Sequence, residues 1–506
     1  MITTVLDYLD DISRRFPDKV AYEDTAVSFT FKALTERARK IGSEIARQLP
    51  PQSPVVVYMK KGAHNIPAFF GAAYAGCFYV PIDKDMPDER IKLIVDVLKP
   101  GAVVCDSTTK DLVNSNIPGI PVIYDDEADS FEIDEDRLCK IRSEVKTTDL
   151  LYVLFTSGST GVPKGVTISH AAVIDFMEWI CDKYNLSEST SLCNQAPFYF
   201  DASVPDLYIP LKTGASVYIP PKSYYTFPKK ILGFIKEKGI NTLIWVPSAL
   251  CNVVNARAFE VCVPDTVRLV IFCGEVMPCR HLNVWKKYIP DALYVNMYGP
   301  TEATYACMYY DITRDFADDE VLPLGKACEN SSIYLITDEN KEAGPGEQGE
   351  ICIAGICLSN GYFNNKEKSD AVFTQHPLNE RWFERVYHTG DLAMRCDNGD
   401  IVFCGRKDFQ IKKLGHRIEL GEIENAICSL EQIKNACCIY DEESTNIVAV
   451  FSGDMDSDEL SKCLTARLMP YMMPSVYVKM SAIPMNLNGK IDRPRIKKMY
   501  LEGELS

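Results

Sequence analysis

Short apolar runs alternate with helical patterns over most of this 506-residue chain. Pro54 to Tyr58 and Leu151 to Phe155 have the length and composition of strands, whereas Ala33 to Leu49 has apolar residues at helical spacing. Three more strand-like runs are Gly101 to Cys105, Leu243 to Val246 and Leu269 to Phe272. Strands that alternate with helices predict an α/β fold of mostly parallel sheets covered by helices.

The pattern changes beyond about Ile333, where shorter strands are separated by Gly-rich turns at 344–347 and 397–400. Such turns are typical of hairpins and predict a small β-barrel-like part. The final hundred residues return to mixed helix and strand, and 506 residues exceed what one core usually holds. We therefore expect a large N-terminal domain over 1–404 and a small α+β C-terminal domain over 405–506.

Composition and charge exclude some classes of protein. Apolar residues make up 46% of the chain and charged residues 25%, as in ordinary globular proteins. The formal net charge of −16 argues against a nucleic-acid partner, which needs a basic face. We expect a soluble protein.

The 19 cysteines are scattered without a C-x-x-C pair, so neither a zinc ribbon nor a thioredoxin-type site is indicated. The first residues have no basic region followed by an apolar run, and the most apolar stretch, Ile66 to Ile82, is interrupted by Pro67. These features favour a cytoplasmic protein with no membrane insertion and with reduced cysteines.

The strongest local motif is Leu154 to Gly165, which follows a predicted strand. Its glycines let backbone N–H groups approach a polyphosphate, its hydroxyls donate further hydrogen bonds, and Lys164 adds charge. It is not a Walker A loop, because Gly165 stands where that motif needs Ser or Thr. The candidate polyphosphate-binding residues here are Thr156, Ser157, Gly158, Ser159, Thr160, Gly161 and Lys164.

This loop resembles the phosphate loop of the adenylate-forming superfamily of acyl- and aminoacyl-AMP ligases, and the resemblance implies that its candidate residues bind ATP. Four further segments resemble that family's adenine and magnesium, ribose, hinge and catalytic-lysine motifs, and they occur in the family's order. They are Asn296–Glu302, Tyr387–Asp391, Gly405–Lys412 and Pro484–Asp492. The resemblance covers essentially the whole chain.

The resemblance implies a role for each residue of the adenine and magnesium segment. Tyr298 would stack on adenine, and Asn296 would pair with its polar edge. Thr301 would contact the α-phosphate of ATP, and Glu302 would hold Mg²⁺ against the leaving pyrophosphate. Gly274 and Glu275 would also lie at the nucleotide.

Asp391 would accept hydrogen bonds from the two ribose hydroxyls, with Arg406 nearby. Lys490 would bridge the substrate carboxylate and the phosphate in the transition state. Taken singly, Asp391 as a turn cap and Lys490 as a solvated lysine are open alternatives. The ordered set of five segments argues against both.

Phe198 to Val204 resembles the amino-acid-activating branch, in which an aspartate at the position of Asp201 binds the substrate's ammonium group. A carboxylate in an apolar stretch is costly to bury unless it meets a cation. The alternative is that Asp201 caps the turn that follows.

Within this branch the chain is most similar to the D-alanine-activating, carrier-protein-dependent ligases, where the residue matching Cys273 lies beside the alanine methyl group. Pro205, Met297 and Tyr305 depart from that pattern at expected pocket positions. One methylene changes the selection between substrates by about 1–3 kcal/mol, so these departures leave the amino acid and its chirality open. They point towards a substrate with an equally small or smaller side chain.

The family implies two half-reactions, formation of aminoacyl-AMP and transfer to a carrier's phosphopantetheine thiol. Between them a small domain turns about the residue matching Asp408, and the loop from Lys412 to Arg417 replaces Lys490. Gly415 would leave room for the pantetheine. We expect an acidic carrier to dock on a basic patch of Lys412, Lys413, Arg417 and the Arg493–Lys498 cluster.

Three readings remain as hypotheses besides the leading one, a D-alanine ligase that feeds a carrier protein for cell-envelope teichoic acid esterification. The chain could be a stand-alone adenylation enzyme for another amino acid in a nonribosomal peptide or natural-product pathway. It could be an acyl-CoA ligase or a non-catalytic nucleotide sensor, although the intact loop and Lys490 argue against a sensor. We expect a monomer.

Overall fold

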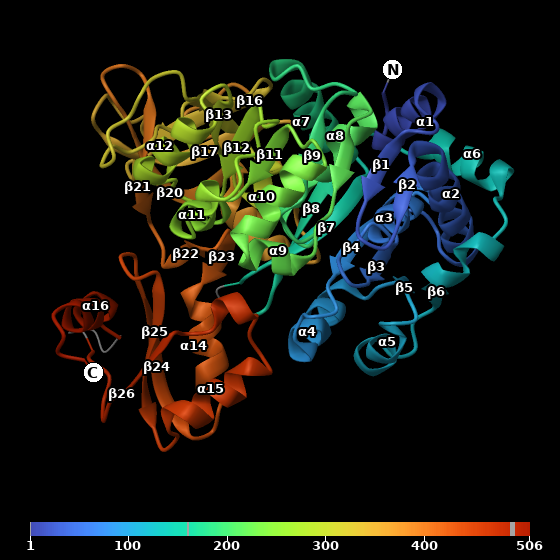
Figure 1. Ribbon diagram of the computed structural model, residues 1–506. Coiled ribbons are helices and arrows are strands. Elements are labelled where there is room, and N and C mark those ends of the chain that lie inside the picture. Colours follow the sequence, from blue (N-terminus) through green and yellow to red (C-terminus); the bar gives the residue numbers. More distant parts are fainter. Residues whose placement is uncertain (1, 159–160, 486–490, 506) are drawn as a thin grey trace. The chain divides into compact units, whose positions relative to one another are not determined.

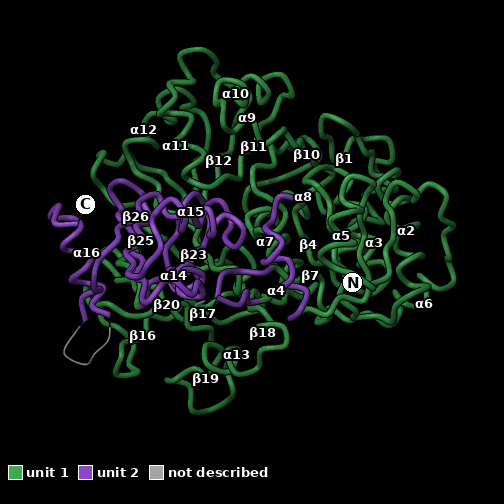
Figure 2. The backbone as a smooth tube through the Cα atoms, turned by 90° about the horizontal axis from the view of Figure 1, so that it is seen from below, with its two compact units in different colours: residues 1–84, 98–154, 165–407 green, residues 85–97, 155–164, 408–506 purple. Residues whose placement is uncertain are grey.

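The computed structural model describes residues 2–158, 161–485 and 491–505. The chain divides into two compact units, shown in two colours in Figure 2. Unit 1 comprises 1–84, 98–154 and 165–407, and unit 2 comprises 85–97, 155–164 and 408–506. Two short internal segments therefore group with the C-terminal residues, a feature that the expected linear division at residue 404 does not contain.

The first large sheet has seven strands in the order β18-β8-β7-β4-β3-β5-β6. Its central pairs, β7-β4-β3-β5-β6, are parallel, and β18 is antiparallel to β8. Their bounds are β3 Pro54–Tyr58, β4 Phe78–Ile82, β5 Ala102–Cys105, β6 Val122–Tyr124, β7 Leu150–Thr156, β8 Lys164–Ser169 and β18 Gly361–Tyr362.

The second large sheet has nine strands in the order β15-β14-β13-β12-β11-β9-β10-β1-β2. It is parallel from β13 to β1 and has antiparallel strands at both edges. Its strands are β1 Val20–Glu23, β2 Ser28–Thr30, β9 Ser191–Cys193, β10 Ser216–Tyr218, β11 Thr242–Trp245, β12 Leu269–Cys273, β13 Leu293–Tyr298, β14 Met308–Asp311 and β15 Lys326–Ala327.

Helices of unit 1 cover these sheets (Figure 1). They are α1 Val5–Arg15, α2 Phe31–Gln48, α3 Asn65–Tyr74, α5 Lys110–Asn116, α6 Glu135–Glu144, α7 His170–Lys183, α8 Val204–Thr213, α9 Lys222–Thr226, α10 Pro228–Glu237, α11 Pro247–Asn255, α12 Cys279–Tyr288 and α13 Lys366–Val372. Short 3-10 turns are η1 Asp125–Ser130, η2 Asp201–Ser203, η3 Ala258–Glu260 and η4 Thr301–Ala303.

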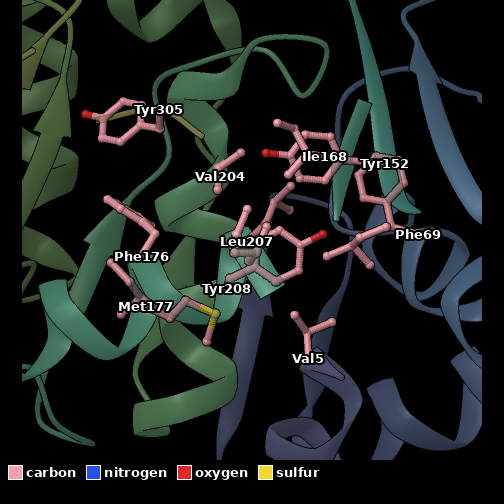
Figure 3. Packing of buried hydrophobic residues seen from close by; sticks show 14 of the residues in the cluster. Val5, Phe69, Tyr152, Ile168, Phe176, Met177, Val204, Leu207, Tyr208 and Tyr305 are labelled. Carbon is pink, nitrogen blue, oxygen red and sulfur yellow. The ribbon is translucent and has the colours of Figure 1, made fainter. Parts of the chain in front are cut away.

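One apolar cluster joins residues of both sheets with α7 and α8 (Figure 3). Tyr208 of α8 lies against Tyr152 of β7 with ring centroids 6.5 Å apart, and its hydroxyl is 2.7 Å from that of Tyr79 on β4. Phe176 of α7 meets the Tyr305 ring edge-on at 5.6 Å. This core therefore continues to a residue expected in the substrate pocket.

A separate five-stranded antiparallel sheet forms the part expected to be barrel-like. The order β16-β17-β20-β19, with β21 also paired to β20, leaves the described sheet open. Its strands are β16 Ser331–Ile336, β17 Gln348–Gly355, β19 Phe373–Gln375, β20 Arg385–Arg395 and β21 Ile401–Arg406. The turns at 344–347 and 397–400 connect antiparallel neighbours, so both expected hairpins are confirmed.

Unit 2 has a hairpin and a three-stranded sheet, β24-β25-β26, with helices. Its C-terminal elements are β22 Gln410–Lys413, β23 His416–Glu419, α14 Leu420–Cys428, β24 Ile433–Asp441, β25 Asn446–Gly453, α15 Ser457–Thr465, η5 Pro470–Met472, β26 Val476–Lys479 and α16 Arg493–Leu501. Most of α4, Asp88–Leu98, also belongs to this unit. The predicted mixture of helix and strand after residue 404 is confirmed.

Candidate active site

The carboxylate expected to bind ribose is the centre of a buried polar cluster in unit 1. Asp391 on β20 pairs with Arg406 on β21 and is 2% exposed. The Tyr298 hydroxyl donates to Asp391 Oδ2 at 2.5 Å, and the Arg406 guanidinium donates to Oδ1. Burial raises the pKa of Tyr298 well above its usual value, so this hydroxyl remains a donor. The structure thus brings the expected adenine and ribose residues together.

Each oxygen of a carboxylate can accept two hydrogen bonds. Asp391 therefore keeps acceptor capacity for two hydroxyls beyond the bonds from Tyr298 and Arg406. The Thr389 hydroxyl accepts a bond from the Asp391 backbone N–H at 3.0 Å, and the Thr389 carbonyl accepts one from Arg406 at 3.1 Å. These bonds fix the strand and the guanidinium around the carboxylate.

The magnesium candidate Glu302 is fully buried in η4, which follows β13 after Gly299 and Pro300. The Tyr362 hydroxyl donates to Glu302 Oε1 at 2.7 Å, a partner that the sequence did not indicate. Thr301, the neighbouring α-phosphate candidate, is 9% exposed. Asn296, at the other end of the segment, donates to the Pro323 carbonyl at 2.8 Å. The adenine and magnesium segment thus forms a strand and turn of fixed conformation.

The expected substrate residues gather around the ends of β12 and β13. Cys273 and Met297 are register partners on these strands, and both are buried. Tyr305 is 3% exposed and has a left-handed backbone, with φ of 76°. Burial raises the pKa of Tyr305 well above its usual value, and the Asp201 carboxylate acts in the same direction. Asp201, the first residue of η2, is therefore close enough to act on Tyr305 electrostatically.

Three further candidates adjoin these strands. Pro205 is buried in the first turn of α8. Gly274 follows Cys273 with φ of 98°, a conformation that favours glycine. Glu275 accepts a hydrogen bond from the Ser248 backbone N–H at 2.9 Å. Glu275 thus ties the turn after β12 to the start of α11.

The phosphate-loop candidates belong to unit 2. A Cβ at Gly158 would lie 2.0 Å from the Val162 carbonyl oxygen, so only glycine fits there without moving the backbone. Gly161 has φ of 80° and donates its N–H to the Gly158 carbonyl at 2.9 Å. Ser159, Thr160 and the catalytic candidate Lys490 lie outside the described residues. The conformation of this loop thus requires glycine at Gly158 and favours it at Gly161.

Several donors of this loop contact acceptors from 408–506. The Gly158 N–H donates to Glu422 Oε2 at 3.1 Å, and Lys164 Nζ lies 3.4 Å from Glu419 Oε1. The Ser157 hydroxyl donates to the Arg417 carbonyl at 2.9 Å. Among the residues that the structure describes, the Thr156 hydroxyl has no hydrogen-bond partner. Carboxylates thus occupy two of the donors expected to bind phosphate.

Sequence reasoning missed these carboxylates and the arginine behind them. Arg90 of α4 lies 2.5 Å from Glu422 Oε1, and both side chains are less than a tenth exposed. Burial raises the pKa of Glu422, and Arg90 acts in the opposite direction. No sequence motif singled out Glu419 or Glu422, and the pairing of Glu422 with a residue 332 positions earlier was not visible in the sequence.

The hinge candidate Asp408 is the first residue of the C-terminal segment of unit 2. Its Oδ1 accepts the Gln410 backbone N–H at 3.1 Å, which closes a local turn. Leu414 and Gly415 both have positive φ, 53° and 78°, between the paired strands β22 and β23. Gly415 thus occupies the tip of a two-residue hairpin turn.

Basic residues of the expected docking patch contact acids of the same unit. Arg493 lies 2.8 Å from Glu424, and Lys497 lies 2.8 Å from Glu442. Burial lowers the pKa of Lys413, which lies on β22. The docking patch stays a prediction, and these pairs reduce its net positive charge.

Known proteins are similar to this chain over nearly its full length. The family model described as AMP-binding enzyme matches residues 9–363. The chain belongs to the AMP-binding enzyme family. It is 32% identical to D-alanine--D-alanyl carrier protein ligase of Lactiplantibacillus plantarum, covering 98% of this chain and 99% of the relative. It is also 31% identical to a mycosubtilin synthase of Bacillus subtilis, covering 97% of this chain and 19% of that protein.

The fold also matches a solved structure of an adenylation domain. The chain superposes on the Vibrio cholerae adenylation domain AlmE, solved in complex with glycyl-adenosine-5'-phosphate, with a TM-score of 0.84 and 18% identity. The match covers 99% of this chain and 98% of that one. It confirms the predicted fold class. No helix among the described residues has the length and apolar composition needed to cross a membrane.

Proposed function

We propose that this enzyme is an ATP-dependent ligase that activates a small amino acid as aminoacyl-AMP and transfers it to a carrier protein. D-alanine is the leading candidate for this amino acid. The main support for this proposal is the similarity to D-alanine--D-alanyl carrier protein ligase over 98% of the chain. The buried Tyr298–Asp391–Arg406 cluster supports the nucleotide half of this proposal.

In the first half-reaction the amino acid's carboxylate attacks the α-phosphate of ATP and pyrophosphate leaves. Asp391 would accept the ribose hydroxyls, Tyr298 would pack against adenine, and Asn296 would pair with the adenine edge. The loop from Thr156 to Lys164 would donate to the phosphates through its N–H groups, hydroxyls and ammonium. Lys490 would bridge the carboxylate and the α-phosphate as charge develops between them.

Magnesium is the metal that this reaction implies. Mg²⁺ in nucleotide sites is held by one or two carboxylates together with phosphates and water. Glu302 fits this role, because a single protein carboxylate is enough and the Tyr362 hydroxyl at Oε1 holds its side chain in place. Bound Mg²⁺ would neutralise the leaving pyrophosphate. Thr301, the residue before it, would contact the α-phosphate.

In the second half-reaction the carrier's thiol attacks the adenylate carbonyl, and AMP leaves. We expect the small domain to reorient about Asp408 between the steps, so that Lys490 acts in the first and the Gly415 turn in the second. The aminoacyl carrier would then serve cell-envelope teichoic acid esterification. We propose a cytoplasmic monomer for this role.

The amino acid is the least constrained part of the proposal. Asp201 would bind its ammonium group, and Cys273, Met297 and Tyr305 would surround its side chain. Tyr305 is buried and packs on Phe176, and a side chain of this size beside the substrate would favour alanine or glycine over larger amino acids. The similarity to a mycosubtilin synthase keeps a natural-product adenylation role as the second candidate.

The deciding experiment is amino-acid-dependent exchange of labelled pyrophosphate into ATP. It compares D-alanine, L-alanine, glycine, serine and the other common amino acids, with Lys490→Ala as the inactive control. D-alanine as the one strong substrate supports the proposal. Strong exchange with another amino acid keeps the chemistry and overturns the substrate. Absence of exchange with every amino acid, from folded enzyme, overturns amino-acid activation.

A further inference from the structure

Three side chains with metal-binding groups lie on one face of the ladder between β17 and β20. Glu350 and Cys352 are two residues apart on β17, which points them to the same face of the sheet. Cys352 is the register partner of His388 on β20, and the pairing is irregular between Glu350 and Cys352. The backbone therefore brings a carboxylate, a thiol and an imidazole close together. None of the three has a role in the proposed reaction.

The distances within this cluster fit a tetrahedral metal ion. His388 Nδ1 lies 3.4 Å from Cys352 Sγ and 3.1 Å from Glu350 Oε2, and all three ligand atoms lie within 4.8 Å of one another. Zinc bonds of about 2.0 Å to nitrogen or oxygen and about 2.3 Å to sulfur, in tetrahedral geometry, place ligand atoms roughly 3.3–3.6 Å apart. Small side-chain movements would suffice to bind zinc.

Hydrogen bonds to the other polar atoms of Glu350 and His388 also orient these side chains, as in established metal sites. The Gly390 backbone N–H donates to Glu350 Oε1 at 2.8 Å, which leaves Oε2 directed at the cluster. His388 Nε2 lies 3.1 Å from the Thr374 hydroxyl, which fixes the ring with Nδ1 towards Cys352. Such outer bonds orient ligands and set the imidazole tautomer.

We propose that Glu350, Cys352 and His388 bind one Zn²⁺ ion, with water as the fourth ligand. The thiol gives its proton to solvent and binds as thiolate, while His388 binds as neutral imidazole through Nδ1. Cys352 is fully buried, whereas the His388 side chain is 25% exposed, so water reaches the cluster from the histidine side. The ion would join β17 to β20 three residues before Asp391.

The ammonium group of Lys407 competes with a metal ion for the Glu350 carboxylate. This ammonium lies 3.4 Å from Glu350 Oε2 and 2.6 Å from Asp338 Oδ1. Metal binding would break the contact between Lys407 and Glu350 and leave the shorter contact between Lys407 and Asp338. Burial also raises the pKa of the Cys352 thiol to about 12, so the ion has to displace a proton. Both effects weaken zinc binding without removing the ligands.

Zinc affinity and stoichiometry of the full chain, measured by competition with a chromogenic chelator, test the proposal. We expect one tight equivalent per chain and, with Cd²⁺ as probe, a thiolate-to-metal charge-transfer band. Cys352→Ser should weaken zinc binding at least tenfold and abolish the band, whereas Cys404→Ser, on the neighbouring strand β21, should leave both unchanged. Equal affinity in the wild type and Cys352→Ser overturns the site.

Two further variants keep the test decisive if Cys352→Ser folds poorly. Thr374→Val removes the bond behind His388 and should weaken zinc binding about tenfold. Lys407→Gln removes the competing ammonium and should strengthen it severalfold. Opposite changes in these two variants support the proposal, and unchanged affinity in both contradicts it. Neither measurement depends on ligase activity, so the result is independent of the proposed function.

Discussion

The ribose-side cluster and the phosphate loop differ in where their partners come from. Asp391, Arg406 and Tyr298 bond to one another within unit 1, and Asp391 and Arg406 are neighbours on paired strands. The phosphate loop instead bonds to Glu419 and Glu422, which lie more than 250 residues later in the chain. The ribose-side residues thus bond to one another, whereas the donors of the phosphate loop bond to carboxylates from elsewhere in the chain.

Carboxylates and phosphates compete for the same donors, because both are oxyanions that accept from N–H groups and ammonium. A Gly158 N–H or a Lys164 ammonium bonded to a glutamate has to exchange that partner before it fully engages ATP. We infer that nucleotide binding is preorganised on the ribose side and conditional at the phosphates. Four substitutions test this difference, from the largest expected effect to the smallest.

Asp391→Asn tests the preorganised side. Loss of the charge weakens acceptance of the ribose hydroxyls and leaves the half-buried Arg406 guanidinium without its counter-ion. We expect pyrophosphate exchange to fall on the order of 100-fold, since truncating one partner of a buried charge pair costs about 2–5 kcal/mol. Exchange kinetics at varied ATP measure this. Asp397→Asn, at an exposed turn in the same hairpin, should retain full activity.

Gly158→Ala tests whether the loop needs its observed conformation. The added Cβ would meet the Val162 carbonyl oxygen at 2.0 Å, so the loop must change shape. We expect exchange to fall about 10- to 100-fold through a misplaced phosphate site. Gly233→Ala in α10, where a Cβ meets nothing within 4 Å, is the matched control and should be fully active. A fully active Gly158→Ala enzyme would remove the loop from the phosphate site.

Tyr298→Phe removes one hydroxyl from the ribose-side cluster and keeps the ring. Asp391 loses a buried donor, so we expect the KM for ATP to rise about tenfold, in line with about 1.5 kcal/mol for a hydrogen bond to a charged group. Tyr294→Phe on the same strand removes a hydroxyl that donates to the Ile289 backbone carbonyl, away from Asp391, and should leave the KM unchanged. An unchanged KM in both variants would mean that Asp391 needs no preorganisation.

Sequence patterns predicted the elements of the ribose side well, for a local reason. The turn at 397–400 was expected to join two strands, and it joins β20 to β21. Once that hairpin is known, Asp391 and Arg406 must lie close, because antiparallel register follows from the turn. The Tyr298 bond to Asp391 was not predictable, because two different sheets have to be packed before it forms.

The partners of the phosphate loop were beyond sequence reasoning for a different reason. Arg90 and Glu422 each lie on an ordinary helix, and neither spacing nor composition distinguishes them from solvated charges. Only tertiary packing buries them together and makes the pair specific. The density of glycine and hydroxyls predicts a phosphate-binding loop, and this stays a prediction. That density did not predict which groups of the protein bond to the loop.

Glu419→Gln tests the conditional side and should have the smallest effect. The substitution keeps an oxygen that can accept the 2.7 Å bond from Gln410 but removes the charge facing Lys164. Because Lys164 then bonds a phosphate without first leaving a carboxylate, we expect the KM for ATP in pyrophosphate exchange to fall about two- to fivefold. Glu431→Gln, at an exposed position of the same unit, should leave the KM unchanged. A higher KM in Glu419→Gln would mean instead that the glutamate positions Lys164 for ATP, and the loop would then be as preorganised as the ribose side.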